Sequence, residues 1–266
     1  MKKLLLSLSV VAFLAACSTN AITGRKQLSL FPESTLQQEA LTQYQTFLSQ
    51  NKVVNQNTSK DAEMVRRVGT RIAQAITSFY AQKGQSSELD GYKWEFNLVD
   101  NKEVNAWCMP GGKVVVYTGL LPVTQNETAL AVVLGHEIAH AIARHGNERM
   151  SEALLINLGG VVLEEALKTK KSETQTLFLG LYMIGSNLAL ALPNSRMQES
   201  EADKLGLIFM SMAGYDPNEA IPFWQRMAAN NKSNVPQFLS THPSDETRIK
   251  KLSALLPEIR SAYYKQ

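Results

Sequence analysis

Two histidines four residues apart, with a glutamate directly after the first, are the residues of this sequence best suited to chemistry. On an α-helix, residues i and i+4 lie on one face about 6 Å apart, so the imidazoles of His136 and His140 can converge on one metal ion. Glu137 lies beside that face, where a carboxylate can take a proton from a metal-bound water. The pattern therefore predicts a zinc site with a general base.

The segment from Thr124 to His145 has the composition of a buried helix. Thr124 and Glu127 fit a capping box at its start, and Gly146 fits a stop after its end. Apolar residues recur between them at helical spacing. Unpaired histidines are costly in an apolar helix, which favours metal ligands over ordinary core histidines.

Two histidines leave a catalytic zinc ion short, because such sites have three protein ligands and a water. The metzincin pattern, which would supply a third histidine, requires glycine at position 143 and histidine at 146. The chain has Ala143 and Gly146, so that class is excluded. His145 is one position out of register, and a cation at the end of a helix is its favoured interpretation.

A second predicted helix is the better source of a third ligand. It begins at Ser195, which forms a capping box with Gln198, and ends near Gly214. Glu199 and Asp203 then share one face, where one carboxylate can bind metal and the other can accept the free N–H of a ligand histidine. A solvated acidic face is the alternative, since Glu-x-x-x-Asp is a weak pattern without the two histidines.

The chain resembles the M48 family of zinc metallopeptidases, particularly its OMA1-like bacterial lipoprotein members. The resemblance is carried by Asn105-Ala106 and Pro110-Gly111-Gly112, His136-Glu137-x-x-His140, Asn194-Ser195-Arg196 with Glu199, Glu201-Ala202-Asp203 and Thr241-His242-Pro243. Together these motifs span most of residues 60–256. The first helix and the N-terminus are not covered by the resemblance.

The resemblance implies a zincin-like domain of the gluzincin type. Its fold would be α+β and predominantly helical, with a small β-hairpin or sheet beside the active-site helix. It implies one Zn²⁺ per chain held by His136, His140 and Glu199, with Glu137 as the general base. Asp203 would be an assisting acid or the carboxylate that orients a ligand histidine, and the second role is favoured on physical grounds.

His242 precedes Pro243 in a predicted loop, and its role is left open by the sequence. Near the metal it could stabilise an oxyanion, or it could occupy the water position as a latch. Away from the metal it would be an ordinary loop histidine.

The first residues have the pattern of a bacterial lipoprotein signal. Two lysines and an apolar run over residues 4–14 are typical of a signal peptide. The following Leu14-Ala15-Ala16-Cys17 resembles a lipobox, which implies removal of residues 1–16 and lipidation of Cys17. A simple signal peptide cleaved before an unmodified Cys17 is the alternative. Because Ser18 is not aspartate, the resemblance favours the periplasmic face of the outer membrane.

Removal of residues 1–16 would leave 250 of the 266 residues, enough for one domain with a sizeable core. Since Lys2 and Lys3 would be lost, the net charge would fall from +3 to +1, too even for nucleic-acid binding. We expect a lipidated N-terminus, tether and first helix over 17–55, and a peptidase domain over 56–266. Cys108 would have no intrachain partner, which favours a buried small side chain over a regulatory thiol.

The remaining elements are predicted from hydrophobic periodicity. We expect helices near 34–50, 59–82 and 245–256, a half-buried strand over 92–98, and a hairpin over 105–118 next to the histidine helix. A hairpin strand could pair with an extended substrate peptide, although an interior strand is equally compatible with the sequence. Two further runs, 152–166 and 177–192, are strongly apolar. The second is too short for a membrane span, which favours a buried hairpin helix or a substrate-facing wall, with a membrane-contacting patch as the alternative.

These features lead us to expect a lipid-anchored periplasmic zinc endopeptidase that acts on unfolded or misassembled envelope proteins. The alternative is a chaperone-like or latent binding module with a closed or structural zinc site. Glu137 favours the enzyme, because a structural zinc site has no need of a carboxylate beside an open position. The oligomeric state is not indicated by the sequence.

Overall fold

The computed structural model describes residues 17–154, 195–229, 237–242 and 246–264. The predicted signal peptide over 1–16, most of the apolar run 152–166 and all of 177–192 lie outside these ranges. The chain divides into two compact units, Met1–Leu36 with Arg144–Leu192, and Gln37–Ala143 with Pro193–Gln266. The second unit, called the catalytic unit below, contains the predicted metal ligands.

The catalytic unit is mostly helical with one small sheet, which confirms the predicted α+β class. Its helices are α2 (Glu33–Gln50, whose first turn belongs to the other unit), α3 (Lys60–Gln82), α4 (Leu121–Thr124), α5 (Glu127–Ile142), α8 (Arg196–Met212), α9 (Ala220–Ala229), α10 (Gln237–Thr241) and α11 (Glu246–Tyr263). Its strands are β3 (Glu95–Val99), β4 (Ala106–Met109) and β5 (Lys113–Tyr117).

The three strands form a sheet in the order β3-β5-β4. Strands β4 and β5 are antiparallel, as the predicted hairpin requires, whereas β3 pairs with β5 in parallel. The parallel partner was not predicted. In the described residues β4 is therefore an edge strand, and it contacts α5 directly.

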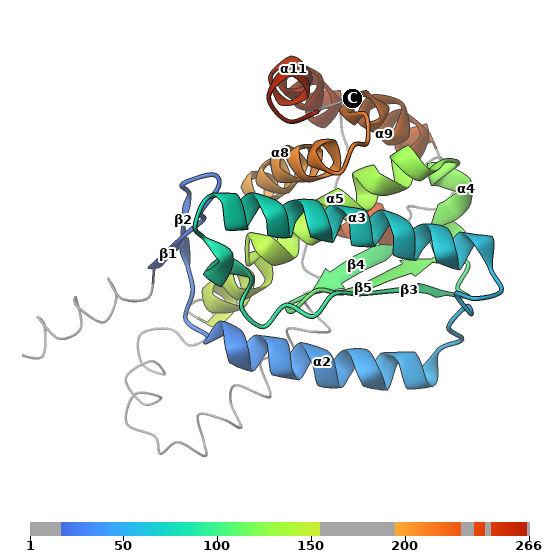
Figure 1. Ribbon diagram of the computed structural model, residues 1–266, viewed down its shortest axis with the longest axis horizontal. Helices are drawn as coiled ribbons and strands as arrows, with labels where there is room; N and C mark the ends of the chain where they lie inside the picture. Colours follow the sequence, from blue (N-terminus) through green and yellow to red (C-terminus); the bar gives the residue numbers. More distant parts are fainter. Residues whose placement is uncertain (1–16, 155–194, 230–236, 243–245, 265–266) are drawn as a thin grey trace, which may run out of the picture. The chain divides into compact units, whose positions relative to one another are not determined.

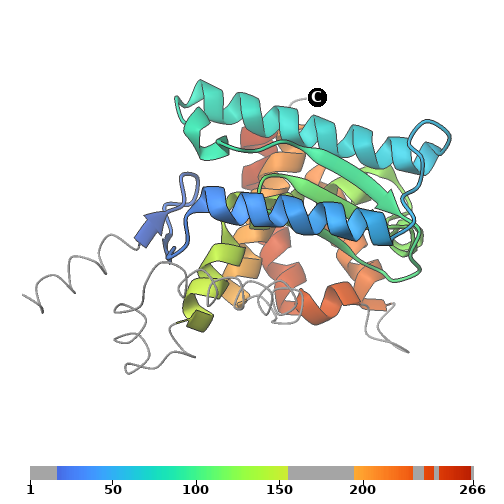
Figure 2. The same cartoon turned by 90° about the horizontal axis from the view of Figure 1, so that it is seen from below.

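Each face of the sheet is covered by helices, with α2 on one side and α3 and α5 on the other (Figures 1 and 2). Trp107, Val115 and Tyr117 pack with Tyr44 of α2 in one buried cluster. On the opposite face, a Cβ atom on Gly69 of α3 would overlap the ring of Phe96. The sheet thus fixes the position of the helices that carry the predicted ligands.

Helix α5 begins later than the sequence suggested. Its N-cap is Asn126, whose side-chain oxygen accepts from the Ala129 N–H at 2.8 Å. The predicted Thr124 cap is wrong, because Thr124 ends the short helix α4 and its hydroxyl donates to the Leu121 carbonyl. Gln125, at φ 65°, turns the chain between the two helices.

The predicted stop at Gly146 is also wrong. Helix α5 ends at Ile142, and Arg144 makes the left-handed turn with φ 56°. A further helical stretch then occupies residues 145–154 and includes Gly146. His145 starts this stretch and is buried, so it does not have the predicted place at the end of α5.

Helices α5 and α8 cross with their backbones in contact. A Cβ atom on Gly135 would lie 2.7 Å from the carbonyl oxygen of Gly206, and one on Gly206 would lie 2.8 Å from the backbone nitrogen of His136. Two glycines therefore permit the close approach that brings α8 against the His136 side of α5. The predicted capping box between Ser195 and Gln198 is present at the start of α8.

The first unit contains the segment that the sequence suggested as a tether. Residues Cys17–Thr19 (β1) and Lys26–Leu28 (β2) instead form an antiparallel pair. Arg25 makes two hydrogen bonds to Glu148, of 2.5 and 2.8 Å, and the Leu30 N–H donates to Ser151. The described part of this segment is therefore tied to the helical stretch 145–154.

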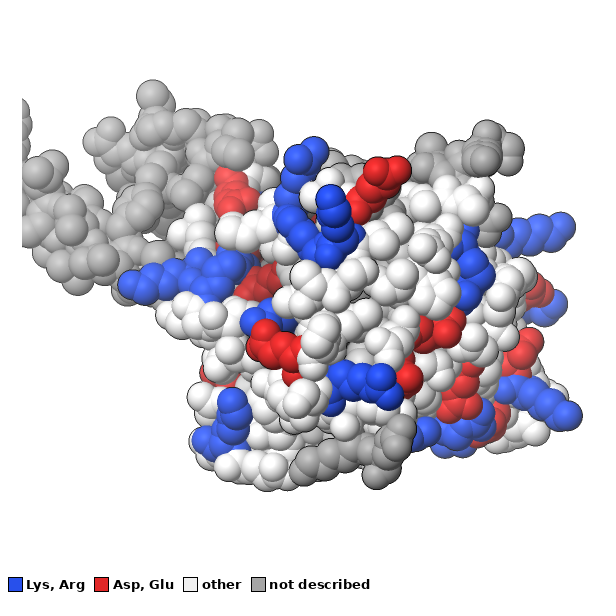
Figure 3. Space-filling model, turned by 90° about the horizontal axis from the view of Figure 1, so that it is seen from above, with Lys and Arg blue, Asp and Glu red and all other residues white. Residues whose placement is uncertain are grey.

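Neither the helices nor the surface charges described here have an extreme character. Within the described ranges, every helix is too short or too polar to cross a bilayer. On the face shown in Figure 3, basic and acidic side chains are interspersed among neutral ones.

Candidate metal centre

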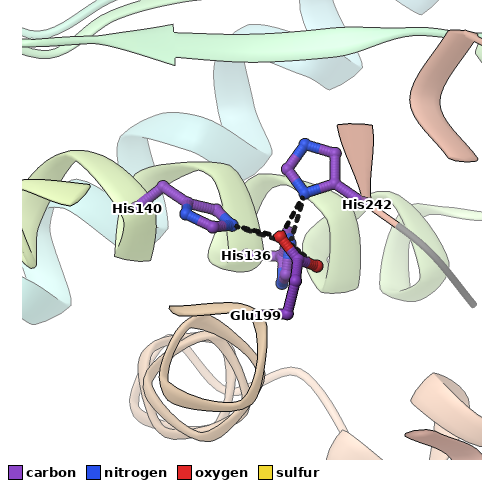
Figure 4. A group of neighbouring side chains, drawn as sticks. All are labelled: His136, His140, Glu199 and His242. Carbon is purple, nitrogen blue, oxygen red and sulfur yellow. Dashed lines mark hydrogen bonds and ion pairs between the residues drawn. The ribbon is translucent and has the colours of Figure 1, made fainter. Parts of the chain in front are cut away.

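Four buried side chains converge on one point in the catalytic unit. His136 and His140 come from α5, Glu199 comes from the first turn of α8, and His242 directly follows α10 (Figure 4). One ligand atom from each lies within 4.8 Å of the other three. In the described residues, the two predicted histidines and the predicted carboxylate thus meet, and His242 joins them.

The spacing of these atoms suits a tetrahedral zinc ion. Four donors that surround one zinc at ~2.0–2.1 Å are about 3.3 Å from one another. The Nε2 atoms of His136 and His140 are 3.1 Å apart, and Nε2 of His140 is 3.2 Å from Oε1 of Glu199. Nδ1 of His242 is 2.8 Å from that same oxygen and 3.1 Å from Nε2 of His136.

Two buried carboxylate oxygens support the presence of a cation. Oε2 of Glu199 and Oε1 of Glu137 have no hydrogen-bond donor although both are buried. Oε2 of Glu199 lies 3.1 Å from Nη1 of Arg248 and 3.4 Å from Nε2 of His136, and Oε1 of Glu137 lies 3.5 Å from Nε2 of His242, all outside hydrogen-bond geometry. Because buried charges require compensation, the donor set and these oxygens fit a divalent metal.

Asp203 lies one turn beyond Glu199 and faces the other side of the His136 ring. Its Oδ1 is 3.1 Å from Nδ1 of His136. A carboxylate at Nδ1 favours the tautomer with the proton on Nδ1 and the lone pair of Nε2 directed at the convergence point. This geometry matches the orienting role considered for Asp203.

The electrostatics of the chain without a metal ion show how strongly these groups interact. Burial alone would lower the pKa of His136, but the charges of Glu199 and Asp203 outweigh it and raise the pKa to about 9. Burial would raise the pKa of Glu199, but the facing histidines hold it far below its usual range. Glu199 is therefore a carboxylate at any physiological pH, as a metal ligand must be.

Glu137 differs from its neighbours, because burial dominates and raises its pKa above the usual value for glutamate. The nearby positive charges of His242 and His136 only partly oppose this effect. A carboxylate with a raised pKa and no hydrogen-bond donor on Oε1 is suited to accept a proton.

Sequence reasoning missed Arg248, which lies against this cluster. Its Nε and one terminal nitrogen donate to the two oxygens of Asp203, at 2.9 and 2.7 Å. The guanidinium lies 3.6 Å from the ring centroid of Trp224, a buried side chain that also contacts the His136 ring. A signal was present, because Arg248 begins the apolar stripe of α11 that continues with Leu252 and Leu256.

Among the described residues, Cys108 does not belong to the ligand group. Cys17 lies in β1 of the first unit. Cys108 lies on β4, where burial raises the pKa of its thiol and the charge of Glu137 adds to the effect. A raised pKa disfavours the reactive thiolate, but Cys108 is partly exposed and not fully buried as expected.

A mostly helical domain with this cluster fits the metal centre of a zincin-like metallopeptidase. Residues 59–256 match peptidase family M48, and the chain belongs to that family. The family resemblance inferred from the motifs is thus confirmed. Its members use zinc, so the metal expected at the cluster is a single Zn²⁺ ion.

Named relatives include eukaryotic and bacterial proteases. Mitochondrial metalloendopeptidase OMA1 of Saccharomyces cerevisiae is 38% identical over 189 residues, which cover 67% of this chain and 51% of the relative. Human mitochondrial OMA1 is 28% identical over 258 residues, which cover 94% of this chain and 48% of the relative. The beta-barrel assembly-enhancing protease of Yersinia pestis is 34% identical over 166 residues, covering 59% and 33%. The chain thus spans about half the length of the OMA1 proteins it matches.

Proposed function

We propose that the protein is a zinc metalloendopeptidase. The observation that carries the proposal is the convergence of His136, His140 and Glu199 on one point, with Glu137, whose Oε1 accepts no hydrogen bond, next to it on α5. In this proposal the first three side chains hold the metal and Glu137 is the general base. Asp203 orients His136 through Nδ1.

A bound zinc ion would supply Lewis acidity, which lowers the pKa of water and polarises a carbonyl group. Glu137 takes the proton from the attacking water, for which its raised pKa suits it, and delivers this proton to the leaving amine. Asp203 keeps the Nε2 lone pair of His136 directed at the metal throughout.

Strand β4 is the proposed platform for the substrate backbone. It is an edge strand among the described residues and packs on α5, which carries the two histidines and Glu137. An extended peptide could add to this edge through main-chain hydrogen bonds. Such pairing tolerates many side chains, which suits the cleavage of unfolded proteins.

His242 supports the latch interpretation over the oxyanion interpretation. Its Nδ1 lies 2.8–3.1 Å from donor atoms of Glu199 and His136, which is the distance expected of a fourth zinc ligand. A catalytic zinc site keeps one position open. We therefore infer that the arrangement described here is a closed form and that the His242 imidazole leaves this position when substrate enters.

The proposed substrates are unfolded or misassembled proteins of the bacterial envelope. The name of the Yersinia pestis relative, a beta-barrel assembly-enhancing protease, supports this setting. The sequence of residues 1–17 supports a lipid anchor at Cys17 and a place on the periplasmic face of the outer membrane. Replacing Cys17 by serine should then release the protein from the membrane fraction, and its continued co-sedimentation with membranes would contradict the anchor.

The decisive test of the activity is Glu137→Gln. The wild-type protein should cleave casein, a chelator should abolish cleavage, and Glu137→Gln should lower kcat/KM by at least ~10²-fold because the general base is lost. The variant should still bind one zinc per chain, measured by elemental analysis. Zinc binding without cleavage of casein by the wild type would instead favour a binding module with a closed metal site.

A further inference from the structure

Arg248 of α11 joins three parts of the metal centre with one buried guanidinium group. It donates from two nitrogens to Asp203, and its third nitrogen, Nη1, donates to the backbone carbonyl of His242 at 3.3 Å. The same Nη1 lies 3.1 Å from Oε2 of Glu199. The side chain is only 6% exposed, and one face of the guanidinium lies on the ring of Trp224.

These contacts leave the Asp203 carboxylate little freedom. Both of its oxygens accept from Arg248, and Oδ1 also lies 3.1 Å from Nδ1 of His136. A carboxylate held in place by two hydrogen bonds is the partner that fixes the orientation of a ligand histidine.

We propose that Arg248 is a positioning residue of the zinc centre, which holds Asp203 against His136 and anchors the main chain at His242. This inference depends on the proposed function, because it assumes that His136 is a zinc ligand. Arg248 acts through Asp203 and the His242 backbone, and its Nη2 also lies 3.4 Å from both ring nitrogens of His136, so it need not touch the substrate.

A lysine cannot reproduce this arrangement. Arg248 uses three different nitrogens in a planar fork, whereas lysine carries one nitrogen at the end of a flexible stem. Arg248→Lys keeps the positive charge but should lose the paired hydrogen bonds to Asp203. The substitution therefore separates the geometry of the guanidinium from its charge.

The matched control is Arg226, which is partly buried in the same unit. It donates to the carbonyl oxygens of Val123 and Thr124 and pairs with Glu219, so it also joins elements through several nitrogens. These contacts of Arg226 do not involve the residues of the metal cluster. Arg226→Lys should lower stability without changing the metal centre.

The experiment measures zinc affinity by competition with a chromophoric chelator, together with the absorption spectrum of the Co²⁺-loaded protein. Arg248→Lys should weaken zinc binding by ~10–100-fold, the usual effect of losing a partner of a ligand histidine, and should alter the Co²⁺ bands. Arg226→Lys should leave the zinc affinity within twofold of wild type and the Co²⁺ spectrum unchanged. Near-UV circular dichroism checks that each variant is folded.

The double variant Arg248→Lys/Asp203→Asn tests the route of the effect. If Arg248 acts through Asp203, the fold-loss of zinc affinity in the double variant will be smaller than the product of the fold-losses in the two single variants. Wild-type zinc affinity in Arg248→Lys, or an equal loss in Arg226→Lys, would overturn the proposal.

A second variant covers the case in which Arg248→Lys does not fold. Arg248→Ala leaves space for a free guanidinium ion, and millimolar guanidinium, but not ammonium, should restore zinc affinity. Equal effects of the two cations would overturn the proposal. None of these readouts uses proteolysis, so an inactive wild type that binds zinc would contradict the proposed function while leaving the role of Arg248 to be judged by zinc affinity.

Discussion

His242 is the residue that most affects how the centre would work. Its Nδ1 occupies a corner of the donor set, and its ring stacks on Phe238 with centroids 4.6 Å apart. The sequence could not distinguish between a role at the metal and a role in a distant loop, because position 242 is remote in the chain from position 136. The fold brings them together.

Replacing His242 by alanine should therefore raise proteolysis. If the open form is populated at ~10%, removal of the latch raises kcat/KM by ~10-fold, measured on casein at saturating zinc. The affinity for zinc should fall at the same time, because one donor is lost.

The double variant His242→Ala/Glu137→Gln is the control that any gain comes from this site. If the single variant His242→Ala instead lowers kcat/KM by ~10²-fold and leaves the zinc affinity unchanged, His242 would be assigned to oxyanion stabilisation.

The proposed metal ligands were the most predictable residues, and Arg248 was the least. A ligand histidine or carboxylate belongs to a motif with fixed spacing, such as positions 136 and 140 on one helix face. Arg248 is recognised only by what it contacts. Its one sequence signal, a charge on an apolar stripe, has many explanations, and the Asp203 partner lies 45 residues away.

Among the secondary-structure elements, the crossing of α5 and α8 determines where Glu199 lies relative to the histidines. The capping box that starts α8 follows from local sequence and was predicted. The contact between Gly135 and Gly206 was not, because a glycine inside a helix does not reveal which neighbour it faces.

Gly206→Ala should disturb the metal centre from a distance. The new methyl group would lie 2.8 Å from the backbone nitrogen of His136, so the helices must separate. Overpacking of this kind costs ~1–3 kcal/mol of unfolding free energy, and zinc affinity should fall with it. Urea unfolding and chelator competition measure the two effects.

Gly146→Ala is the matched control for that variant. Gly146 is also helical, but no atom lies within 4 Å of an added Cβ. This substitution should be neutral or stabilise the protein by up to ~1 kcal/mol. Equal destabilisation by both variants would mean that helix crossing is not the cause.

The first turn of α5 is tied to its neighbours by Glu127. Its carboxylate accepts from Arg67 of α3 at 2.7 Å and from the Tyr215 hydroxyl at 2.8 Å. The hydrogen bonds from Arg67 lower the pKa of Glu127 below 4.5. This contribution to stability is therefore complete above pH 4.5 and is lost as the pH falls through the lower pKa of the folded state.

Glu127→Gln should lower the unfolding free energy by about 1 kcal/mol at pH 7, a modest value because the side chain is partly exposed. The difference from wild type should disappear at acidic pH, as measured by urea unfolding over a pH series. Asp100→Asn, which breaks a fully exposed pair with Lys52, should show little effect at any pH. A difference for Glu127→Gln that grows on acidification would contradict the sign of the pKa shift.

At the scale of the whole molecule, the predominantly helical class followed from the family resemblance, and the order of the elements followed from periodicity. The sheet topology did not, since the parallel pairing of β3 with β5 depends on contacts across the chain. Residues 17–28, part of the segment expected to be a tether, form the strand pair β1–β2. Short polar segments such as 17–28 acquire structure only from a partner, here the stretch 145–154.

Removal of zinc should destabilise the catalytic unit as a whole. The buried carboxylates and histidines would lose their compensating cation, and at zinc concentrations ~1,000-fold above the dissociation constant this is worth ~4 kcal/mol. All three tryptophans, at positions 94, 107 and 224, lie in this unit, so intrinsic fluorescence follows its unfolding. A chelator should lower Tm, and added zinc should restore it.

Glu137→Gln should show the same shift in Tm, because it keeps the proposed ligands. An unchanged Tm in the presence of the chelator would contradict a metal at the cluster.

The backbone contact between Gly135 and Gly206 also has a mechanical consequence. Because no side chain separates the two backbones, a shift of α5 against α8 would bring backbone atoms into steric overlap. We therefore expect His136, His140 and Glu199 to keep fixed relative positions, as parts of one rigid frame. His242 is outside that frame, on the chain between α10 and α11. Movement of the His242 imidazole away from the cluster would therefore leave the crossing of α5 and α8 unchanged.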